Sequence, residues 1–367
     1  MFNNIYKDKK VLVTGHTGFK GSWLVSWLIK LGAKVVGISK DIPTNPSMFE
    51  ELELENLITH YLEDIRDLDK MVEIFKAEKP DFLFHLAAQP IVSTSYNNPI
   101  ETISSNIMGT ANILETLRIL DKKITAIIIT SDKAYDNIEQ IWGYKENDAM
   151  GGKDIYSGSK GGAELVIKSY FHSFFKNSDK IRLAIGRAGN VIGGGDWAQD
   201  RIVVDCVEAW NRGESVEIRS PEATRPWQLV LEPLSGYLNL GAELFENSKF
   251  HGEAFNFGPK SEQNRTVLEL LTDLSKDWNI KEPYKVTDNI PFHEAGLLKL
   301  NCDKALAYLK WQSTLHYSET IQFTSNWYLN FYNQRKNSFE ITKNQITEYE
   351  DLAKHRHLNW ANLGLIK

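Results

Sequence analysis

Short apolar runs alternate with longer amphipathic segments through the first half of the chain. The apolar runs predict strands at Val11–Thr14, Lys34–Ile38, Phe82–Leu86, Ile124–Thr130 and Arg182–Gly186. The segments between them carry helical spacing and predict helices at Gly21–Leu31, Leu68–Ala77, Pro99–Leu120 and Tyr156–Phe175. This alternation predicts an α/β fold, a Rossmann-type doubly wound parallel sheet. Such sheets bind ligands beyond the carboxyl ends of their strands, so we expect the chemistry in the loops there.

The pattern loosens after about residue 190, where loops rich in glycine, proline and tryptophan separate the helices. We therefore predict a sheet domain over residues 1–190 and a smaller, mainly substrate-binding domain over residues 191–335, with some elements crossing between them. The charged tail, residues 336–367, predicts an extra helix on the surface.

Composition narrows the class of protein. Of the 367 residues, 42% are hydrophobic, enough for a large core or two packed domains. The net charge of −6 gives no reason to expect a nucleic-acid partner. Cys206 and Cys302 fit neither a disulfide framework nor a zinc pattern, so no metal site is predicted. The chain shows no signal segment and no apolar run long enough to span a bilayer, which predicts a soluble cytoplasmic protein without a membrane partner.

The stretch VLVTGHTGFKGSWL places three glycines between the first predicted strand and the first helix. Gly15 allows a tight turn, Gly18 lets a pyrophosphate approach the backbone, and Gly21 lets the helix pack closely. Backbone amides and the positive dipole end at the helix N-terminus complete a site for a dinucleotide cofactor. The other loop residues expected to contact that cofactor are Thr17, Phe19 and Lys20.

Tyr156 and Lys160 are four residues apart in YSGSK, so they share one face of a predicted helix. A lysine ammonium stabilises the phenolate of a neighbouring tyrosine, which then acts as a base nearer neutral pH. Such a pair alone is common on helix surfaces. Together with the glycine loop and Thr130 at a strand end, it predicts oxidation of a secondary alcohol by hydride transfer to the cofactor.

The G-x-x-G-x-x-G loop and the Tyr-x-x-x-Lys pair resemble those of the extended short-chain dehydrogenase/reductase superfamily. The resemblance implies NAD as the cofactor. The second strand, VVGISKD, leaves NADP open, because Asp41 suits a ribose hydroxyl whereas Ser39 and Lys40 tolerate a 2′-phosphate. Further cofactor contacts that the resemblance implies are Asp64, Ile65, Leu86, Ala87 and Ala88.

An acid and an amine, Asp132 and Lys133, follow the strand in ITSDKAYDN. Simple alcohol oxidation needs neither residue, which points to further proton transfers. Oxidation of a hexose at C4 makes the C5 proton acidic, because the resulting carbanion is an enolate. A base then removes that proton while an acid helps the C6 hydroxyl leave as water, and hydride returns to C6. The pair suits such a 4,6-dehydration.

Longer stretches resemble the nucleotide-sugar 4,6-dehydratases, most closely the CDP-glucose group, over about residues 8–330. They are TSDKAYDN, WGYKENDAMGGKDIYSGSKGGAEL, RAGNVIGGGDWAQDRIVVD, ATRPWQLVLEPLSGYL and HEAGLLKLNCDKA. An Asp-Lys pair marks the CDP-glucose group. The resemblance implies Asp132 as general acid toward the C6 hydroxyl, and Lys133 as base toward C5 or stabiliser of the enolate. The division of roles stays open.

The same resemblance implies which residues hold a nucleotide-diphosphate hexose. Arg201 and Arg225 present planar forks that suit a pyrophosphate, although each can instead form a structural ion pair. Asn190 lies in the loop expected to receive the diphosphate, and His293 and Glu294 lie in a late loop expected at the substrate. Further substrate contacts are expected from Gln89, Ser95 and Asn106.

One position departs from the pattern. Where CDP-glucose enzymes carry an arginine, this chain has Ser93 in IVSTSY, a segment expected near the sugar. A GDP- or UDP-linked hexose, with or without an N-acetyl group, therefore stays open as the substrate. Two different functions also stay open: a nucleotide-sugar 4-epimerase, which leaves Asp132 and Lys133 without a role, and a non-catalytic NAD-binding regulator.

The resemblance also implies a setting and an assembly. The product would enter deoxysugar synthesis for lipopolysaccharide or capsule. The branch commonly forms homodimers through two helices of each subunit, for which Pro99–Leu120 and Tyr156–Phe175 are the candidates. A tetramer stays open.

Overall fold

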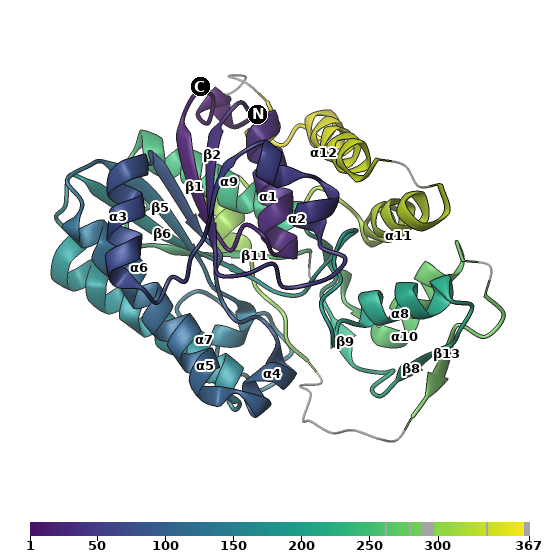
Figure 1. Ribbon diagram of the computed structural model, residues 1–367. Helices are drawn as coiled ribbons and strands as arrows, with labels where there is room; N and C mark the ends of the chain where they lie inside the picture. The colour runs from purple at the N-terminus through teal and green to yellow at the C-terminus, as the bar shows by residue number, and fades with distance from the viewer. Residues whose placement is uncertain (261–262, 279, 288–296, 335–336, 363–367) are drawn as a thin grey trace.

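The computed structural model describes residues 1–260, 263–278, 280–287, 297–334 and 337–362. Its centre is a seven-stranded sheet in the order β11-β6-β5-β4-β1-β2-β3, in which every neighbouring pair is parallel (Figure 1). This sheet confirms the predicted doubly wound α/β fold. The strands are β1 Lys10–Thr14, β2 Lys34–Ser39, β3 Thr59–Leu62, β4 Phe82–His85, β5 Ile124–Ile129, β6 Ile181–Ala188 and β11 Ala254–Phe257.

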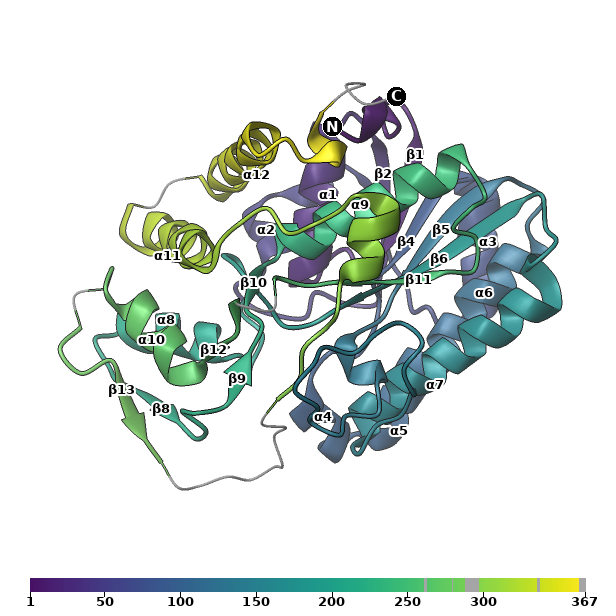
Figure 2. The same ribbon diagram turned by 180° about the vertical axis from the view of Figure 1, so that it is seen from behind.

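Successive strand residues face two separate hydrophobic cores. In β1, Val11 and Val13 pack on the face covered by α1 and α9, whereas Leu12 packs on the opposite face. That second face is covered by α3, α6 and α7 (Figures 1 and 2). Because both faces are buried, the central strands are continuously apolar in sequence. The helices of the two layers are α1 Phe19–Lys30, α9 Leu231–Glu246, α3 Leu68–Glu78, α6 Gly109–Ile119 and α7 Ile155–Tyr170.

The two outermost strands, β3 and β11, were not predicted. β3 has the sequence THYL, and its side chains are exposed or only half-buried. β11 is short and lies beyond the region of clear alternation. Both form edges of the sheet, where one side of the strand lacks a partner and the apolar pattern is weaker.

The helix predicted over Pro99–Leu120 is interrupted. It consists of α5 (Pro99–Ile103), a π-helical turn at Ser104–Met108, and α6. The predicted helix over Tyr156–Phe175 similarly ends in a π-helical turn, at Phe171–Phe175. Such turns admit one extra residue and change which side chains face the core.

A smaller set of elements from the second half of the chain lies beside the sheet (Figure 1). It comprises α8 Ile202–Asn211, β8 Val216–Ile218, β9 Thr224–Arg225, β12 Arg265–Thr266, α10 Val267–Ser275 and β13 Tyr284–Val286. In contrast, α9 and β11 from the same half belong to the layers of the sheet. The chain therefore crosses between the two regions, and the domain boundaries at residues 190 and 335 stay a prediction.

The tail forms α12 (Ser338–His355), which lies against α11 (Tyr317–Gln334) and α1 (Figure 2). Trp27 Nε1 of α1 donates a hydrogen bond to Glu350 Oε1 at 2.8 Å, and Lys30 also binds Glu350. Beyond the helix, Trp360 is 3% exposed and stacks on Phe2, with ring centroids 5.1 Å apart. One face of the tail is thus part of the core.

Three further features bear on function. Across the described residues, no helix is long and apolar enough to cross a membrane. In the same part of the chain, no group of three or more His, Cys, Asp or Glu side chains is arranged to hold a metal ion. Cys206 and Cys302 are free thiols.

Trp360→Ala is expected to lower the free energy of unfolding by about 3 kcal/mol, because it removes a buried ring between the first helix and the tail. Urea denaturation followed by circular dichroism measures the change. Trp142→Ala is the matched control, since that ring is 63% exposed and its loss is expected to cost less than about 0.5 kcal/mol. Equal stability of the two variants would contradict the packing of the tail.

Candidate active site

The carboxyl ends of β1, β4 and β5 are level to within one residue, and β6 runs on from the paired Ile185 to Ala188. Thr14 of β1 pairs with His85 of β4, His85 with Ile128 of β5, and Ile128 with Ile185 of β6. Thr14 Oγ1 lies 2.7 Å from His85 Nδ1 and accepts a hydrogen bond from Ala87 N at 3.2 Å. The loops that follow these strands therefore start from one edge of the sheet.

The glycine loop after β1 has the backbone conformation that its sequence predicts. Gly15 has a φ of +75°, and a Cβ on it would lie 2.8 Å from Ala87 N. A Cβ on Gly21 would lie 2.1 Å from Gly15 O, so α1 packs directly on the loop. A Cβ on Gly18 would lie 3.5 Å from its nearest neighbour, Gly15 O, which leaves the middle of the loop open to a ligand. Dinucleotide binding there stays a prediction.

Side chains of the glycine loop face different ways. Thr17 Oγ1 donates to Asp41 O at 2.7 Å and ties the loop to the end of β2. Lys20 points toward the site, where its Nζ lies 5.8 Å from the centre of the Tyr237 ring. Burial lowers the pKa of Lys20 to about 8, and the charges of Arg201 and Lys160 contribute to that lowering. Phe19 begins α1.

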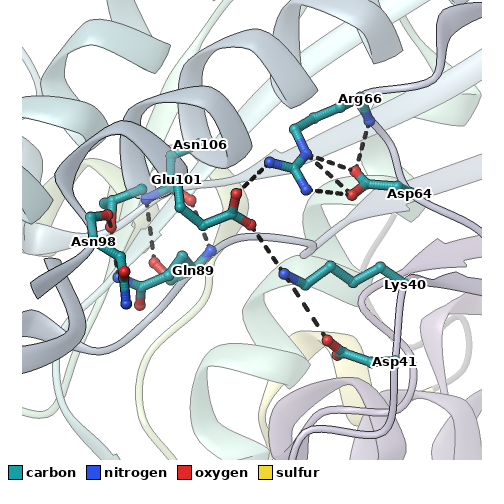
Figure 3. Close-up of polar contacts among 9 residues, drawn as sticks. Lys40, Asp41, Asp64, Arg66, Gln89, Asn98, Glu101 and Asn106 are labelled. Atoms are coloured by element: carbon teal, nitrogen blue, oxygen red, sulfur yellow. Dashed lines mark hydrogen bonds and ion pairs between the residues drawn. The ribbon is translucent and has the colours of Figure 1, made fainter.

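A chain of ion pairs joins the ends of β2 and β3 to α5 (Figure 3). Lys40 Nζ lies 3.1 Å from Glu101 Oε1 and 3.9 Å from Asp41 Oδ2. Arg66 binds Glu101 at 2.5 Å through Nη1 and Asp64 at 2.6 Å through Nη2. Hydrogen bonds from Arg66 lower the pKa of Asp64. Both cations at this edge of the sheet therefore have carboxylate partners.

The other predicted cofactor residues fall in two groups. Leu86, Ala87 and Ala88 follow β4 directly, at the edge where the glycine loop lies, and Leu86 N donates to Thr14 O at 3.1 Å. Ile65 is only 4% exposed and packs in the core covered by α3 and α6. Its contact with the cofactor stays a prediction.

The predicted Tyr-Lys pair lies near the start of α7, which Asp154 caps by accepting a backbone hydrogen bond. Tyr156 and Lys160 are 8% and 7% exposed, and Lys160 Nζ lies 5.9 Å from the centre of the Tyr156 ring. Burial raises the pKa of Tyr156 to about 12, and the charge of Arg201 acts to lower it. Burial lowers the pKa of Lys160 to about 8, and the charge of Glu164 acts to raise it. Arg201, predicted to bind phosphate, thus also favours the phenolate.

Thr130 Oγ1 donates a hydrogen bond of 2.5 Å to Glu164 Oε1. Glu164 in turn forms a buried ion pair with Arg187, with Nε at 2.7 Å and Nη2 at 3.0 Å. Neither partner was predicted. Glu164 could have been found, because it follows Lys160 by one helical turn and Tyr156 by two, on the same face. Arg187, on β6, has no comparable signal in the sequence.

Asp132 and Lys133 lie in a short 3₁₀ turn, Asp132–Ala134, directly after β5. Ser131 Oγ donates to Asp132 Oδ1 at 2.9 Å and accepts from Lys133 N at 3.2 Å. Asp132 is 3% exposed, and burial raises its pKa, while the charges of Lys133 and Arg225 act to lower it. Burial thus acts in favour of the protonated carboxyl, the form from which a general acid donates.

Three predicted substrate residues have their polar groups engaged inside the protein. Gln89 N donates to Asn106 Oδ1 at 2.7 Å (Figure 3). Asn106 Nδ2 donates to Ser159 Oγ at 2.8 Å. Ser95 Oγ donates to Val92 O at 2.7 Å. These bonds fix the loop after β4 against the π-helical turn Ser104–Met108, and that turn against α7. Contact of Gln89, Ser95 or Asn106 with a sugar stays a prediction.

The remaining predicted substrate residues come from the second half of the chain. Asn190 and Arg225 are half-buried, and the charge of Arg225 acts on Asp132. Arg201 is also half-buried and begins α8 as its N-cap residue. His293 and Glu294 lie outside the described residues.

Ser93, where an arginine was expected, makes a contact of its own. It lies in α4 (Val92–Asn97), and its hydroxyl donates to Asp200 Oδ2 at 2.5 Å. Asp200 directly precedes Arg201 in the chain. The bond therefore joins the segment expected near the sugar to the segment expected near the diphosphate.

Residues 12–324 match the model of the family described as GDP-mannose 4,6 dehydratase. The chain belongs to this family. A CDP-glucose 4,6-dehydratase of Salmonella typhimurium is 44% identical over 329 residues, which are 89% of this chain and 92% of that protein. The predicted class is thereby confirmed: the chain is a nucleotide-sugar 4,6-dehydratase.

Solved structures share the fold of this dehydratase at lower identity. A dTDP-glucose 4,6-dehydratase of Streptomyces venezuelae, solved with NAD, has a TM-score of 0.76 and 18% identity, covering 89% of this chain and 100% of that one. A UDP-glucuronic acid 4-epimerase of Bacillus cereus, also solved with NAD, has a TM-score of 0.75 and 23% identity, covering 88% and 99%. Because dehydratase and epimerase share this fold, the fold alone does not distinguish the two reactions.

Lys160→Met is expected to stabilise the dehydratase at pH 7 by up to about 3 kcal/mol, because burial lowers the pKa of Lys160 from 10.5 to about 8. Below pH 8, Lys160 is charged in the folded and the unfolded protein, and its buried ammonium lowers the free energy of unfolding. This loss of stability disappears as the pH rises from 8 to 10.5, because above that range the lysine is neutral in both states. The gain in unfolding free energy should therefore vanish near pH 10.5.

Urea denaturation at a series of pH values between 7 and 10.5 measures this gain. Lys168→Met removes a lysine from a later turn of the same helix and is the control, with no pH-dependent gain expected. A gain for Lys160→Met that is constant over the whole pH range would contradict a costly buried ammonium.

Proposed function

We propose that the chain converts CDP-glucose to CDP-4-keto-6-deoxyglucose with NAD as a bound cofactor. The observation that carries the proposal is the Asp-Lys pair, Asp132 and Lys133, beside the buried Tyr156 and Lys160. The 44% identity to a CDP-glucose 4,6-dehydratase over nearly the whole chain supports the choice of sugar nucleotide.

The proposed roles follow the positions of the groups. Tyr156, as phenolate, takes the proton of the C4 hydroxyl. NAD, when bound, would supply the hydride acceptor for C4 and the hydride donor for C6. Lys133 takes the C5 proton or stabilises the enolate, and C5 is protonated again when hydride is added at C6. Asp132 gives its proton to the C6 oxygen, which leaves as water. The charge of Arg201 acts to lower the pKa of Tyr156. Lys160 Nζ lies 5.9 Å from the centre of the Tyr156 ring, and an ammonium this near favours the phenolate that starts the sequence.

NAD is proposed in preference to NADP because of the contacts at the end of β2. Ser39 Oγ lies 3.0 Å from His16 Nδ1 and accepts from Thr17 N, so the hydroxyl is engaged within the glycine loop. Lys40 and Arg66, the cations near this edge, are paired with carboxylates. A 2′-phosphate would have to compete with those carboxylates. The open middle of the loop at Gly18 leaves room for the pyrophosphate of either cofactor.

A nucleotide-sugar 4-epimerase is the alternative that the sequence leaves open, and a protein with that activity shares the fold. Epimerisation at C4 needs a base and a hydride acceptor but no acid toward C6. The buried Asp132, whose pKa burial raises, has no task in that reaction. The acid therefore favours dehydration.

A panel of sugar nucleotides tests the proposal. With NAD supplied, CDP-glucose should be dehydrated with a kcat/KM at least about 10-fold above those of dTDP-glucose, GDP-mannose and UDP-N-acetylglucosamine. Alkaline absorbance of the 4-keto product and mass spectrometry for loss of water measure turnover. NADP in place of NAD should give little activity. Dehydration of another sugar nucleotide alone would indicate that the segment around Ser93 selects a different substrate. Isomerisation without loss of water would favour the epimerase.

A matched pair of variants tests the Asp-Lys pair within that panel. Lys133→Met should lower the rate of product formation by about 100-fold while NAD is still reduced on mixing with substrate. Lys153→Met removes an exposed lysine from the same loop region and should behave as the unaltered protein. Equal activity of both variants would exclude Lys133 from the elimination.

We also propose that two chains form a homodimer through α5, α6 and α7. These helices lie side by side on one face of the sheet (Figures 1 and 2). Large apolar side chains on these helices and on their adjoining turns are exposed in the single chain, with exposed fractions between 37% and 75%. They are Ile100, Ile103, Met108, Ile119, Leu165 and Phe174. Apolar groups gathered in this way are typical of an interface between protein chains.

The dimer is tested by sedimentation at micromolar concentration. The unaltered chain should sediment as a dimer or a larger assembly built from it, and Leu165→Glu should give monomers, because it introduces a charge at the interface. Ile141→Glu is the control, since Ile141 is 72% exposed in a loop outside these helices. A monomeric unaltered chain would contradict the proposal.

The setting of the reaction completes the proposal. Two free thiols suit a reducing compartment, so we place the enzyme in the cytoplasm. The 4-keto-6-deoxy product is a precursor of deoxysugars of the kind found in lipopolysaccharide or capsule.

A further inference from the structure

One buried ion pair fixes both ends of the segment TSDKAY. At its start, Thr130 Oγ1 donates to Glu164 Oε1 at 2.5 Å. At its end, Tyr135 OH accepts a hydrogen bond from Arg187 Nη1 at 2.8 Å. Glu164 and Arg187 are joined to each other by two bonds, of 2.7 and 3.0 Å. The 3₁₀ turn with the proposed acid and base lies between these two anchors.

The ion pair is enclosed by protein. Both side chains are 4% exposed, so each charge depends on the other for compensation. Arg187 also donates from Nη1 to Glu146 O at 3.0 Å, and its guanidinium carbon lies 5.1 Å from the centre of the Tyr135 ring. A guanidinium with this many partners has one orientation available, which suits it to hold a loop in place.

The anchor at Tyr135 extends to the edge of the sheet. Tyr135 OH donates to Asn256 Oδ1 of β11 at 2.8 Å, and its ring stacks on Tyr144 with centroids 5.3 Å apart. Asn256 is itself held in place, since its backbone N donates to Glu146 Oε1 at 2.8 Å. The end of the segment is thus tied to β6 through Arg187 and to β11 through Asn256.

Glu164 also belongs to the helix of the Tyr-Lys pair. It follows Lys160 by one turn of α7, and its charge acts to raise the pKa of that lysine against the effect of burial. The same carboxylate therefore contacts Thr130 at the end of β5 and acts on Lys160 in α7. A change at Glu164 affects the oxidation pair and the elimination pair together.

We propose that Glu164 and Arg187, acting through Tyr135, are positioning residues that keep Asp132 and Lys133 in place relative to Tyr156 and Lys160. The inference rests on the proposed 4,6-dehydration and adds three residues that are not among the predicted catalytic, cofactor-binding or substrate-binding residues. Oxidation at C4 uses the pair on α7 together with Thr130, which lies at the other end of the segment from Tyr135. Elimination of water needs the acid and base of the turn at a set distance from C5 and C6, so loss of an anchor slows elimination more than oxidation.

Tyr135→Phe provides the test, because it removes both hydrogen bonds of the hydroxyl and keeps the stacked ring. With CDP-glucose and NAD, kcat for loss of water should fall about 10-fold, while KM should change by less than about 2-fold. Reduced cofactor should accumulate during turnover, seen as NADH absorbance in stopped flow, because oxidation outpaces the slowed elimination. If the Tyr135 hydroxyl only stabilised the fold, the NADH absorbance would be the same as in the unaltered enzyme.

Tyr170→Phe is the matched control. Tyr170 lies on the same helix as the Tyr-Lys pair, and its hydroxyl bonds Glu115 at 3.3 Å, away from the turn. Its kcat and NADH signal should equal those of the unaltered enzyme. If Tyr135→Phe fails to fold, Arg187→Lys keeps a charge beside Glu164 but lacks the fork that reaches Tyr135, and should show the same accumulation of NADH.

The outcomes separate this inference from the proposed function. Turnover of CDP-glucose by the unaltered enzyme, with a normal kcat and no NADH accumulation in Tyr135→Phe or Arg187→Lys, overturns the positioning role alone. Absence of water loss from every sugar nucleotide by the unaltered enzyme overturns the proposed function, and the inference with it. Accumulation of NADH in the variants and not in Tyr170→Phe supports the role.

Discussion

The level register of the parallel strands is the constraint on which the site depends. Because β1, β4 and β5 end side by side, residues far apart in the chain emerge at one edge of the sheet. Gly15, Leu86 and Thr130 each follow a strand end by one residue. A shift of one strand by a single residue would exchange its two faces and carry its loop away from the others. The sheet thus sets the positions, and the loops supply the chemistry.

The sequence was informative wherever function depends on a local pattern. The glycine loop, the Tyr-Lys pair and the Asp-Lys pair are short motifs with fixed spacing, and each adopts the local structure expected for it. The pairing of Glu164 with Arg187 was beyond sequence reasoning, because it joins a helix to a strand 23 residues later. For Gln89 and Asn106, the sequence predicted contacts with the substrate. In the fold, their polar groups form hydrogen bonds within the protein. Spacing along one element predicts neighbours, whereas contacts between elements depend on the whole fold.

The site contains ionisable side chains at buried positions, where the charged form of a side chain is unfavourable. Lys160 and Asp132 are both almost inaccessible to water, and burial opposes the charged form of each. Such groups lower stability in exchange for reactivity, as active sites commonly do. The offsetting apolar contacts lie elsewhere, in the two cores of the sheet and in the aromatic cluster around Trp27 and Trp360.

The stacking of Trp360 on Phe2 has a consequence for how the chain folds during synthesis. Phe2, Trp27 and Trp360 pack together, although they come from opposite ends of the described chain. On the ribosome, β1 and α1 emerge early, yet the outer face of α1 stays exposed until α12 and Trp360 have left the exit tunnel. Contacts so distant in sequence also slow folding in solution. For most of its synthesis, the nascent chain therefore exposes the aromatic surface formed by Phe2 and Trp27 to chaperones and to other nascent chains.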